Sequence, residues 1–167
     1  VVDVLENQRH ALVTGAKCVE LEIAIAKEYN KKFGLMSNSG SSANLLAIQA
    51  ANLQKGSEVI TPALTFSTTV APLIQSGLKP IFVDIELETL QASLEEIEGA
   101  INDNTSAIMI PNLIGNMIDW EALSSIAKNN KLLLIEDSCD TIGYKFNGKK
   151  GNPYSDITTT SFYASHI

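Results

Sequence analysis

The stretch LLLIEDSCD, from Leu132 to Asp140, decides the fold. Its apolar residues are typical of a short strand that is covered on both faces, as the strands of parallel sheets are. Similar runs alternate with segments of helical periodicity along the rest of the chain. The sequence therefore predicts an α/β fold, in which a mainly parallel sheet with right-handed connections is flanked by helices.

Hydrophobic periodicity, helix-forming residues and turn residues place the other elements. Helices are predicted over residues 18–31, 43–53, 65–75, 94–101 and 120–128. Strands are predicted over residues 33–36, 58–61, 81–85, 107–110, 132–135 and 157–163, and residues 144–154 are typical of a loop or hairpin. Ser93 and Asp119 are expected to cap the helices that follow them.

Length and composition limit the possible functions. The 167 residues suffice for one domain with a sizeable core, and the net charge of −7 argues against nucleic acid and anionic membranes as partners. The two cysteines are in no metal-ligand spacing, and no apolar run approaches the ~20 residues that span a bilayer. With no recognisable signal peptide, a reducing cytoplasm is the expected compartment. Because the sequence starts at Val1 and stops just after a predicted strand, we expect a fragment of a longer protein.

Polar residues follow several predicted strands, and ligands of open α/β sheets bind beyond the carboxyl ends of the strands. The motif Asn38-Ser39-Gly40-Ser41-Ser42 precedes a predicted helix. A tight glycine turn, hydroxyls and free N–H groups at a helix N-terminus form an anion site. Simple N-capping by serine explains the same residues and is the commoner use of serine at this position.

Two further segments carry chemistry at strand ends. Three acidic residues in Glu136–Asp140 follow the buried strand, where a carboxylate can pair with a protonated ring nitrogen or bind a metal. No histidine lies near them in sequence, and a solvated loop is the alternative. His166, just past the last predicted strand, is a candidate general base or else a surface histidine in a turn.

Taken in order, five segments resemble the sugar aminotransferase family of fold-type-I pyridoxal-phosphate enzymes, over about residues 14–167. They are Ser39–Ala43 (SGSSA), Thr61–Phe66 (TPALTF), Phe82–Asp84 (FVD), Glu136-Asp137 and Ser161-Phe162. Each segment is weak by itself, whereas five in the right order and spacing make a strong match.

The resemblance implies a cofactor-binding role for individual residues. In that family a glycine-serine turn holds the cofactor phosphate, which Ser41 and Ser42 would do here, and Ser161 matches a second serine on the phosphate. Phe66 would stack on the pyridine ring. Asp137 would pair with the pyridine nitrogen and keep it protonated, so that the ring can accept electrons.

Two positions depart from the aminotransferase pattern. Asp140, counted among the expected cofactor-binding residues, stands where members often carry Gln. His166 stands where the aminotransferases place their Schiff-base lysine, five residues after the serine. Because a histidine cannot tether the cofactor, the resemblance implies a noncovalently bound cofactor, most naturally pyridoxamine phosphate. The nucleotide-diphosphate 4-keto-6-deoxyhexose 3-dehydrases are similar in this replacement and in the surrounding residues.

The resemblance thus implies a dehydrase that uses pyridoxamine or pyridoxal phosphate on a nucleotide-linked 4-keto-6-deoxy sugar, in deoxysugar or lipopolysaccharide biosynthesis. His166 would remove a proton from the methylene carbon of the cofactor, and the 3-hydroxyl would leave. Residues 1–167 would be an incomplete large domain of a homodimer. The small C-terminal domain, any iron–sulfur cluster and a reductase partner would lie outside this chain. The alternatives are a sugar aminotransferase, with its lysine past Ile167, and a noncatalytic homologue that only binds cofactor or partner.

Overall fold

The computed structural model describes residues 1–7 and 15–164, which form two compact units. The larger unit comprises Ser37–Tyr144 and the residues from Tyr154 onward, and the smaller unit comprises Val1–Met36 and Lys145–Pro153. Among the described residues, no helix is both long enough and apolar enough to cross a membrane.

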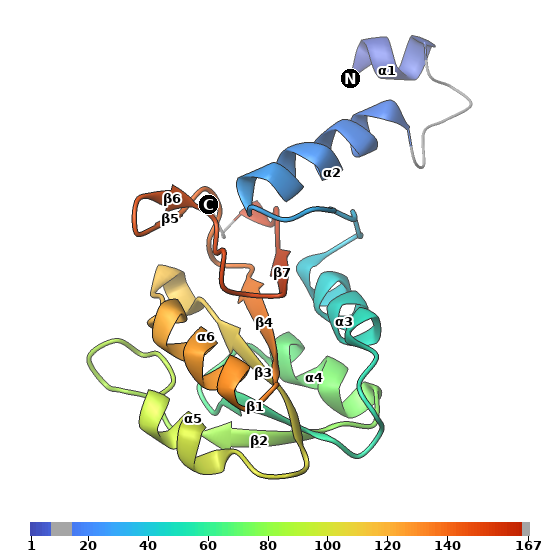
Figure 1. The fold of residues 1–167 in the computed structure, drawn as a ribbon. Coiled ribbons are helices and arrows are strands. Elements are labelled where there is room, and N and C mark those ends of the chain that lie inside the picture. Colours follow the sequence, from blue (N-terminus) through green and yellow to red (C-terminus); the bar gives the residue numbers. More distant parts are fainter. Residues whose placement is uncertain (8–14, 165–167) are drawn as a thin grey trace. The chain divides into compact units, whose positions relative to one another are not determined.

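A five-stranded sheet forms the centre of the larger unit, with the strand order β2-β1-β3-β4-β7 (Figure 1). The strands are β1 (Glu58–Pro62), β2 (Lys79–Val83), β3 (Thr105–Pro111), β4 (Leu133–Ser138) and β7 (Ile157–Thr160). Every neighbouring pair is parallel. All five carboxyl ends therefore lie at one edge of the sheet.

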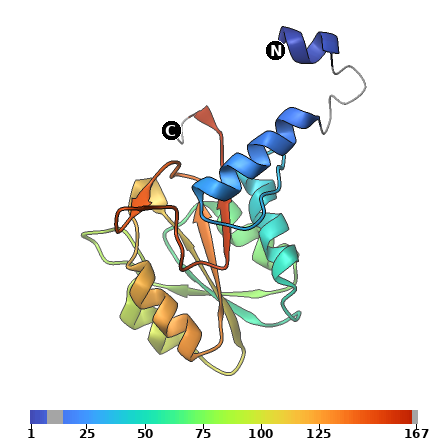
Figure 2. The same ribbon diagram turned by 45° about the horizontal axis from the view of Figure 1, so that its top comes forward.

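Helices cover both faces of this sheet, as Figures 1 and 2 show. α3 (Gly40–Ala51) and α4 (Ser67–Gln75) pack together on one face, and α5 (Leu94–Ala100) and α6 (Trp120–Asn129) lie on the other. A short turn, η1 (Leu113–Gly115), follows β3 and includes a positive φ at Ile114. The predicted fold class, a parallel sheet flanked by helices, is confirmed.

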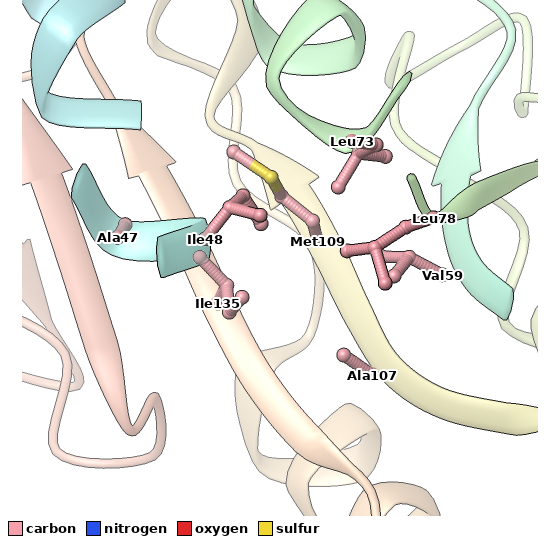
Figure 3. Packing of buried hydrophobic residues seen from close by; sticks show 8 residues of the cluster. All are labelled: Ala47, Ile48, Val59, Leu73, Leu78, Ala107, Met109 and Ile135. Atoms are coloured by element: carbon pink, nitrogen blue, oxygen red, sulfur yellow. The ribbon is translucent and has the colours of Figure 1, made fainter. Parts of the chain in front are cut away.

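Apolar side chains at alternating strand positions fill the space on each face of the sheet. The cluster under α3 and α4 consists of Ala47, Ile48, Val59, Leu73, Leu78, Ala107, Met109 and Ile135 (Figure 3). The intervening strand positions point to the opposite face, and they carry Ile60, Ile108, Ile110 and Leu134, each at most 1% exposed. The sheet is thus buried on both sides, which explains its nearly continuous apolar strands.

The smaller unit contains α1 (Val2–Asn7), α2 (Ala16–Glu28) and an antiparallel hairpin of β5 (Lys145–Phe146) and β6 (Lys149–Lys150). The hairpin loop is Asn147-Gly148, with φ values of 48° and 77°. Asn-Gly is the favoured pair for such a turn, because both residues tolerate positive φ. An ion pair of 2.8 Å between Lys150 and Glu28 links the hairpin to α2.

Three predictions about secondary structure were wrong. Residues 33–36 form no strand, and Phe33 and Leu35 are 79% and 74% exposed. β7 ends at Thr160 rather than at residue 163, and Ser93 precedes α5 without a side-chain cap bond. By contrast, Asp119 caps α6 as predicted, and its carboxylate accepts hydrogen bonds from the N–H groups of Glu121 and Ala122.

Candidate active site

The predicted site residues of the larger unit gather at the carboxyl edge of its sheet. Asp137 lies near the end of β4, Phe66 precedes α4 just beyond β1, and Ser161 follows β7. Ser41 and Ser42 lie in the first turn of α3, which packs against β4 and β7. This helix follows an irregular segment rather than the strand that the sequence predicted before it.

The N-terminus of α3 contains the serine motif, and the structure shows the N-cap interpretation of it. Ser39 is the N-cap, and its Oγ accepts a hydrogen bond of 3.2 Å from the N–H of Ser42. Ser41 is exposed and Ser42 is half-buried, so their hydroxyls flank the start of the helix. The first N–H groups of a helix lack acceptors within it and favour negative charge nearby. Ser39 therefore caps the helix, and an anion site at Ser41 and Ser42 stays a prediction.

Gly40 brings three separate segments into contact. A Cβ atom built on Gly40 would lie 2.7 Å from the Sγ of Cys139 and 3.0 Å from the Cβ of Ser161. Both distances leave no room for a side chain, so glycine is required by the approach of β4 and β7. Because of this contact, the buried Ser161 lies beside the start of α3.

The Asp137 carboxylate is oriented by three donors at a position that is 5% exposed. Its Oδ2 accepts hydrogen bonds of 2.8 Å from the Nδ2 of Asn44 and of 2.8 Å from the Oγ1 of Thr69. Its Oδ1 accepts a bond of 3.2 Å from the N–H of Cys139. A carboxylate held from both oxygens keeps one orientation, which a partner with a fixed N–H requires.

Asn44 is a site residue that the sequence did not single out. Its amide donates to Asp137 and, at 3.2 Å, to the carbonyl of Thr68, while its Oδ1 accepts a bond of 2.6 Å from the Oγ1 of Thr159. The side chain is 1% exposed and links α3, α4, β4 and β7. An asparagine at a buried helical position is an unusual choice, and this is the signal that could have identified it.

A second buried carboxylate, Glu136, points to the opposite face of β4. Its Oε1 accepts hydrogen bonds from the Nδ2 of Asn112, at 2.7 Å, and from the hydroxyl of Tyr144. Its Oε2 accepts bonds of 3.0 Å from Ser155 and 2.9 Å from Thr158. Glu136 is 0% exposed, and the ion pairs among the described residues do not include it. The donors to this carboxyl group are all neutral side chains, and they tie the loop after β4 to the start of β7.

Burial raises the pKa of the Cys139 thiol, and the nearby carboxylate of Asp137 raises it further. Both effects disfavour the thiolate, so the thiol stays protonated near neutral pH. Cys139 is thus a packing residue at this edge of the sheet and lacks the electropositive surroundings of a nucleophile.

The remaining predicted site residues are Phe66, Asp140 and His166. Phe66 is 68% exposed and directly precedes α4. Asp140 binds the backbone, because its Oδ2 accepts a hydrogen bond of 3.0 Å from the N–H of Ile114. His166 lies outside the described residues. Two hydroxyls, of Thr61 at the end of β1 and of Thr65 beside Phe66, are buried and have no hydrogen-bond partner among the described residues.

The family model described as the DegT/DnrJ/EryC1/StrS aminotransferase family matches residues 1–167. The chain belongs to this family. The expected resemblance to sugar aminotransferases is therefore confirmed, together with the fold that it implied.

In the described residues, no three His, Cys, Asp or Glu side chains are arranged to hold a metal ion.

The chain is similar to dehydratases within the DegT/DnrJ/EryC1/StrS family. It is 41% identical over 180 residues to a dTDP-4-dehydro-2,6-dideoxy-D-glucose 3-dehydratase of Saccharopolyspora spinosa, covering 96% of this chain and 38% of the relative. It is 39% identical over 155 residues to a GDP-4-keto-6-deoxy-D-mannose 3-dehydratase of Escherichia coli O55:H7, covering 89% of this chain and 40% of the relative.

Solved structures agree with this similarity. The structure of the E. coli GDP-4-keto-6-deoxy-D-mannose-3-dehydratase with bound hydrated PLP matches with a TM-score of 0.80 and 37% identity. The match covers 88% of this chain and 39% of that one. The chain thus spans about two fifths of the length of the relatives that it matches.

Proposed function

We propose that this chain is the cofactor-binding part of a 3-dehydratase that acts on a nucleotide-linked 4-keto-6-deoxy sugar with pyridoxamine or pyridoxal phosphate. The observation that carries the proposal is the Asp137 carboxylate, buried and held by Asn44 and Thr69 beside the start of α3. Relatives named as 3-dehydratases, one of them solved with PLP, support the substrate class and the cofactor.

The residues present fit such a cofactor. An oriented carboxylate, Asp137, suits a protonated ring nitrogen, and the start of α3 with Ser41, Ser42 and Ser161 suits a phosphate. Phe66 offers an exposed ring for stacking. The buried hydroxyls of Thr61 and Thr65, which lack a hydrogen-bond partner within the described part of the chain, are further polar groups beside the carboxyl end of β1.

The bound cofactor supplies an electron sink that the side chains of this chain lack. Asp137 would keep a proton on the ring nitrogen, because its fixed carboxylate stabilises the charged N–H. The start of α3 would hold the phosphate and fix the position of the ring. His166 would accept a proton near neutral pH, where imidazole is an effective base. Cys139 stays protonated and is not a competing base.

The proposal extends to parts beyond this chain. Residues 1–167 would belong to the large domain of a homodimer, and a small C-terminal domain would complete each subunit. A cytoplasmic location and a separate reductase partner, with or without an iron–sulfur cluster, would suit a biosynthetic step that needs a later reduction. These proposals rest on the resemblance to the family and on the relatives' greater length.

A turnover experiment with the full-length protein, loaded with pyridoxamine phosphate, tests the proposal. GDP-4-keto-6-deoxymannose and its dTDP-linked counterpart are the substrates, and mass spectrometry measures the loss of water. Borohydride treatment of the protein loaded with pyridoxal phosphate is expected to leave no covalent lysine adduct. A trapped lysine adduct together with amino transfer would establish the aminotransferase alternative.

A matched pair of variants separates catalysis from binding. His166→Asn is expected to abolish dehydration and to leave the dissociation constant of pyridoxamine phosphate within about twofold, because the histidine acts as a base. Asp137→Ala is expected to weaken cofactor binding itself, because the ring nitrogen loses its partner. Unchanged turnover in His166→Asn would refute the assignment of the base.

A further inference from the structure

The loop after β3 contains a turn of unexpected sequence. Leu113–Asn116 form a four-residue turn, closed by a hydrogen bond of 3.0 Å from the N–H of Asn116 to the carbonyl of Leu113. Its central residues, Ile114 and Gly115, have φ values of 48° and 85°, which define a type I′ turn. The first central position of this turn normally carries Gly, Asn or Asp, because a β-branched side chain is strained at positive φ.

The same chain contains an ordinary example of this turn. Asn147 and Gly148, in the β5–β6 loop, have φ values of 48° and 77°. At this loop the sequence supplies the expected Asn-Gly pair, whereas after β3 it supplies Ile-Gly. A residue that breaks a local rule at the ligand-binding edge of a sheet indicates that its side chain is needed there.

Neighbouring segments hold the Ile114 turn from three sides. On one side, the Asp140 carboxylate accepts the hydrogen bond of 3.0 Å from the N–H of Ile114. On the second, Asn116 donates to the carbonyl of Thr89 at 2.9 Å and accepts a bond of 2.9 Å from the Nε2 of Gln91. The third anchor, Asn112, is fully buried and belongs to the Glu136 network.

These anchors present an exposed apolar side chain on a rigid support. Ile114 is 68% exposed, although burial of its side chain would have been favourable. It follows β3 and is bound by Asp140, which lies three residues after Asp137. Ile114 therefore lies at the carboxyl edge of the two central strands, where ligands of parallel sheets bind.

We propose that Ile114 contacts the C6 methyl group of a 4-keto-6-deoxy sugar and selects it over a 6-hydroxymethyl group, and that Asp140 is the positioning residue for Ile114. This inference rests on the proposed function and extends it to substrate selection. The methyl group distinguishes a 6-deoxyhexose from an ordinary hexose, and it is the apolar end of the sugar. An apolar side chain that meets a hydroxymethyl group leaves its hydroxyl without a hydrogen-bond partner, which lowers affinity.

Calorimetry with unreactive nucleotide sugars tests this inference without turnover. The probes are GDP-mannose with GDP-6-deoxymannose, and dTDP-glucose with dTDP-6-deoxyglucose, all of which lack the 4-keto group. The full-length protein loaded with pyridoxamine phosphate is expected to bind one of the two 6-deoxy probes about tenfold more tightly than the 6-hydroxy probe with the same nucleotide. In Ile114→Asn, this ratio is expected to fall to within about twofold.

Variants of the supporting residue separate positioning from structure. Asp140→Ala removes the acceptor for the N–H of Ile114 and is expected to lower the 6-deoxy preference. Asp140→Asn keeps an acceptor oxygen and is expected to restore most of it. Ile114→Asn is expected to raise the midpoint of thermal unfolding, because Asn tolerates positive φ. The matched control Asn147→Ile is expected to lower that midpoint and to leave the preference unchanged.

Two results would overturn the inference, and only one of them would also refute the proposed function. If a nucleotide sugar binds but its 6-deoxy preference is the same in the parent protein and in Ile114→Asn, only the selection by Ile114 fails. If none of the four probes binds to the protein loaded with pyridoxamine phosphate, the proposed function fails and the inference fails with it.

Discussion

The Asn44→Asp substitution tests the arrangement of the site most directly. It replaces one nitrogen by an oxygen and preserves the shape of the side chain. The nitrogen that it replaces lies 2.8 Å from the Oδ2 of Asp137 and donates a hydrogen bond to it. The substitution therefore places two carboxylates in direct contact at a position where both side chains are at most 5% exposed.

The separation of these atoms sets the size of the effect. Two unit charges about 3 Å apart repel by about 5 kcal/mol at an effective dielectric constant of about 20. The lost hydrogen bond to a charged group adds about 1.5–3 kcal/mol, and rotation of the two side chains recovers part of the sum. We expect the free energy of unfolding to fall by about 4–6 kcal/mol at pH 7, a large part of the ~5–15 kcal/mol of an ordinary domain.

Urea denaturation, followed by circular dichroism at several pH values, measures this loss. At pH 4 the two carboxyls can share a proton and hydrogen-bond to each other, so the loss is expected to shrink to below about 2 kcal/mol. The stability of the variant relative to the parent protein therefore falls as the pH rises. Asn104→Asp is the matched control, because it makes the same chemical change at an exposed position.

One result would refute the reasoning. If Asn44→Asp unfolds at the same urea concentration as Asn104→Asp at pH 7, then Asn44 does not lie against the Asp137 carboxylate. The affinity for pyridoxal phosphate is a second test of the contact between Asn44 and Asp137. The variant is expected to bind pyridoxal phosphate at least about tenfold more weakly, because repulsion between the two carboxylates turns Asp137 away from the orientation that Asn44 gives it.

Experiments on three other residues, Glu136, Gly40 and Cys139, test the surroundings of the site. Glu136→Leu is expected to lower the free energy of unfolding by about 3 kcal/mol or more, since buried donors lose their acceptor, whereas Glu136→Gln keeps one oxygen and should cost about 1–2 kcal/mol; equal urea midpoints would contradict this. Gly40→Ala is expected to raise the dissociation constant of pyridoxal phosphate about tenfold or more, measured by fluorescence titration, because its methyl group displaces the segments around the phosphate site. Gly99→Ala, whose Cβ would meet nothing within 4 Å, should leave that constant unchanged. Cys139 is expected to react with iodoacetamide at pH 8 at least about tenfold more slowly than a free thiol, because its raised pKa keeps it protonated; rapid alkylation detected by mass spectrometry would contradict this raised pKa. For the same reason stability is expected to fall above about pH 9, where the unfolded thiol ionises first, and the Cys139→Ala variant should lack this part of the fall.

Hydrophobic pattern was enough to predict the sheet and the helices around it. The buried run that ends in β4 is local information, and so is the Asp119 cap of α6. The strand predicted over residues 33–36 failed for a physical reason. Strand residues need a neighbouring strand to satisfy their backbone groups, and a short apolar run cannot reveal whether one exists.

The candidate site was predictable in type but not in its contacts. Asp137 and Ser161 were expected from their positions after strands, and the structure places both at the same edge. The partners of Asp137 come from α3 and α4, and no local pattern reveals which helical side chains meet a strand end. The role of Asp140 depends on the positive φ of Ile114, which the isoleucine side chain would argue against.

The alternation of side chains along β4 determines where this protein tolerates insertions and deletions. Glu136 and Asp137 serve different networks only because successive residues point to opposite faces. Deleting one residue from the first half of β4 would exchange the two acids, burying the shorter one among hydroxyls and turning the longer one toward α3. Changes in length can therefore be absorbed before this strand, near the turn at Lys131, whose φ is 57°, but not within it.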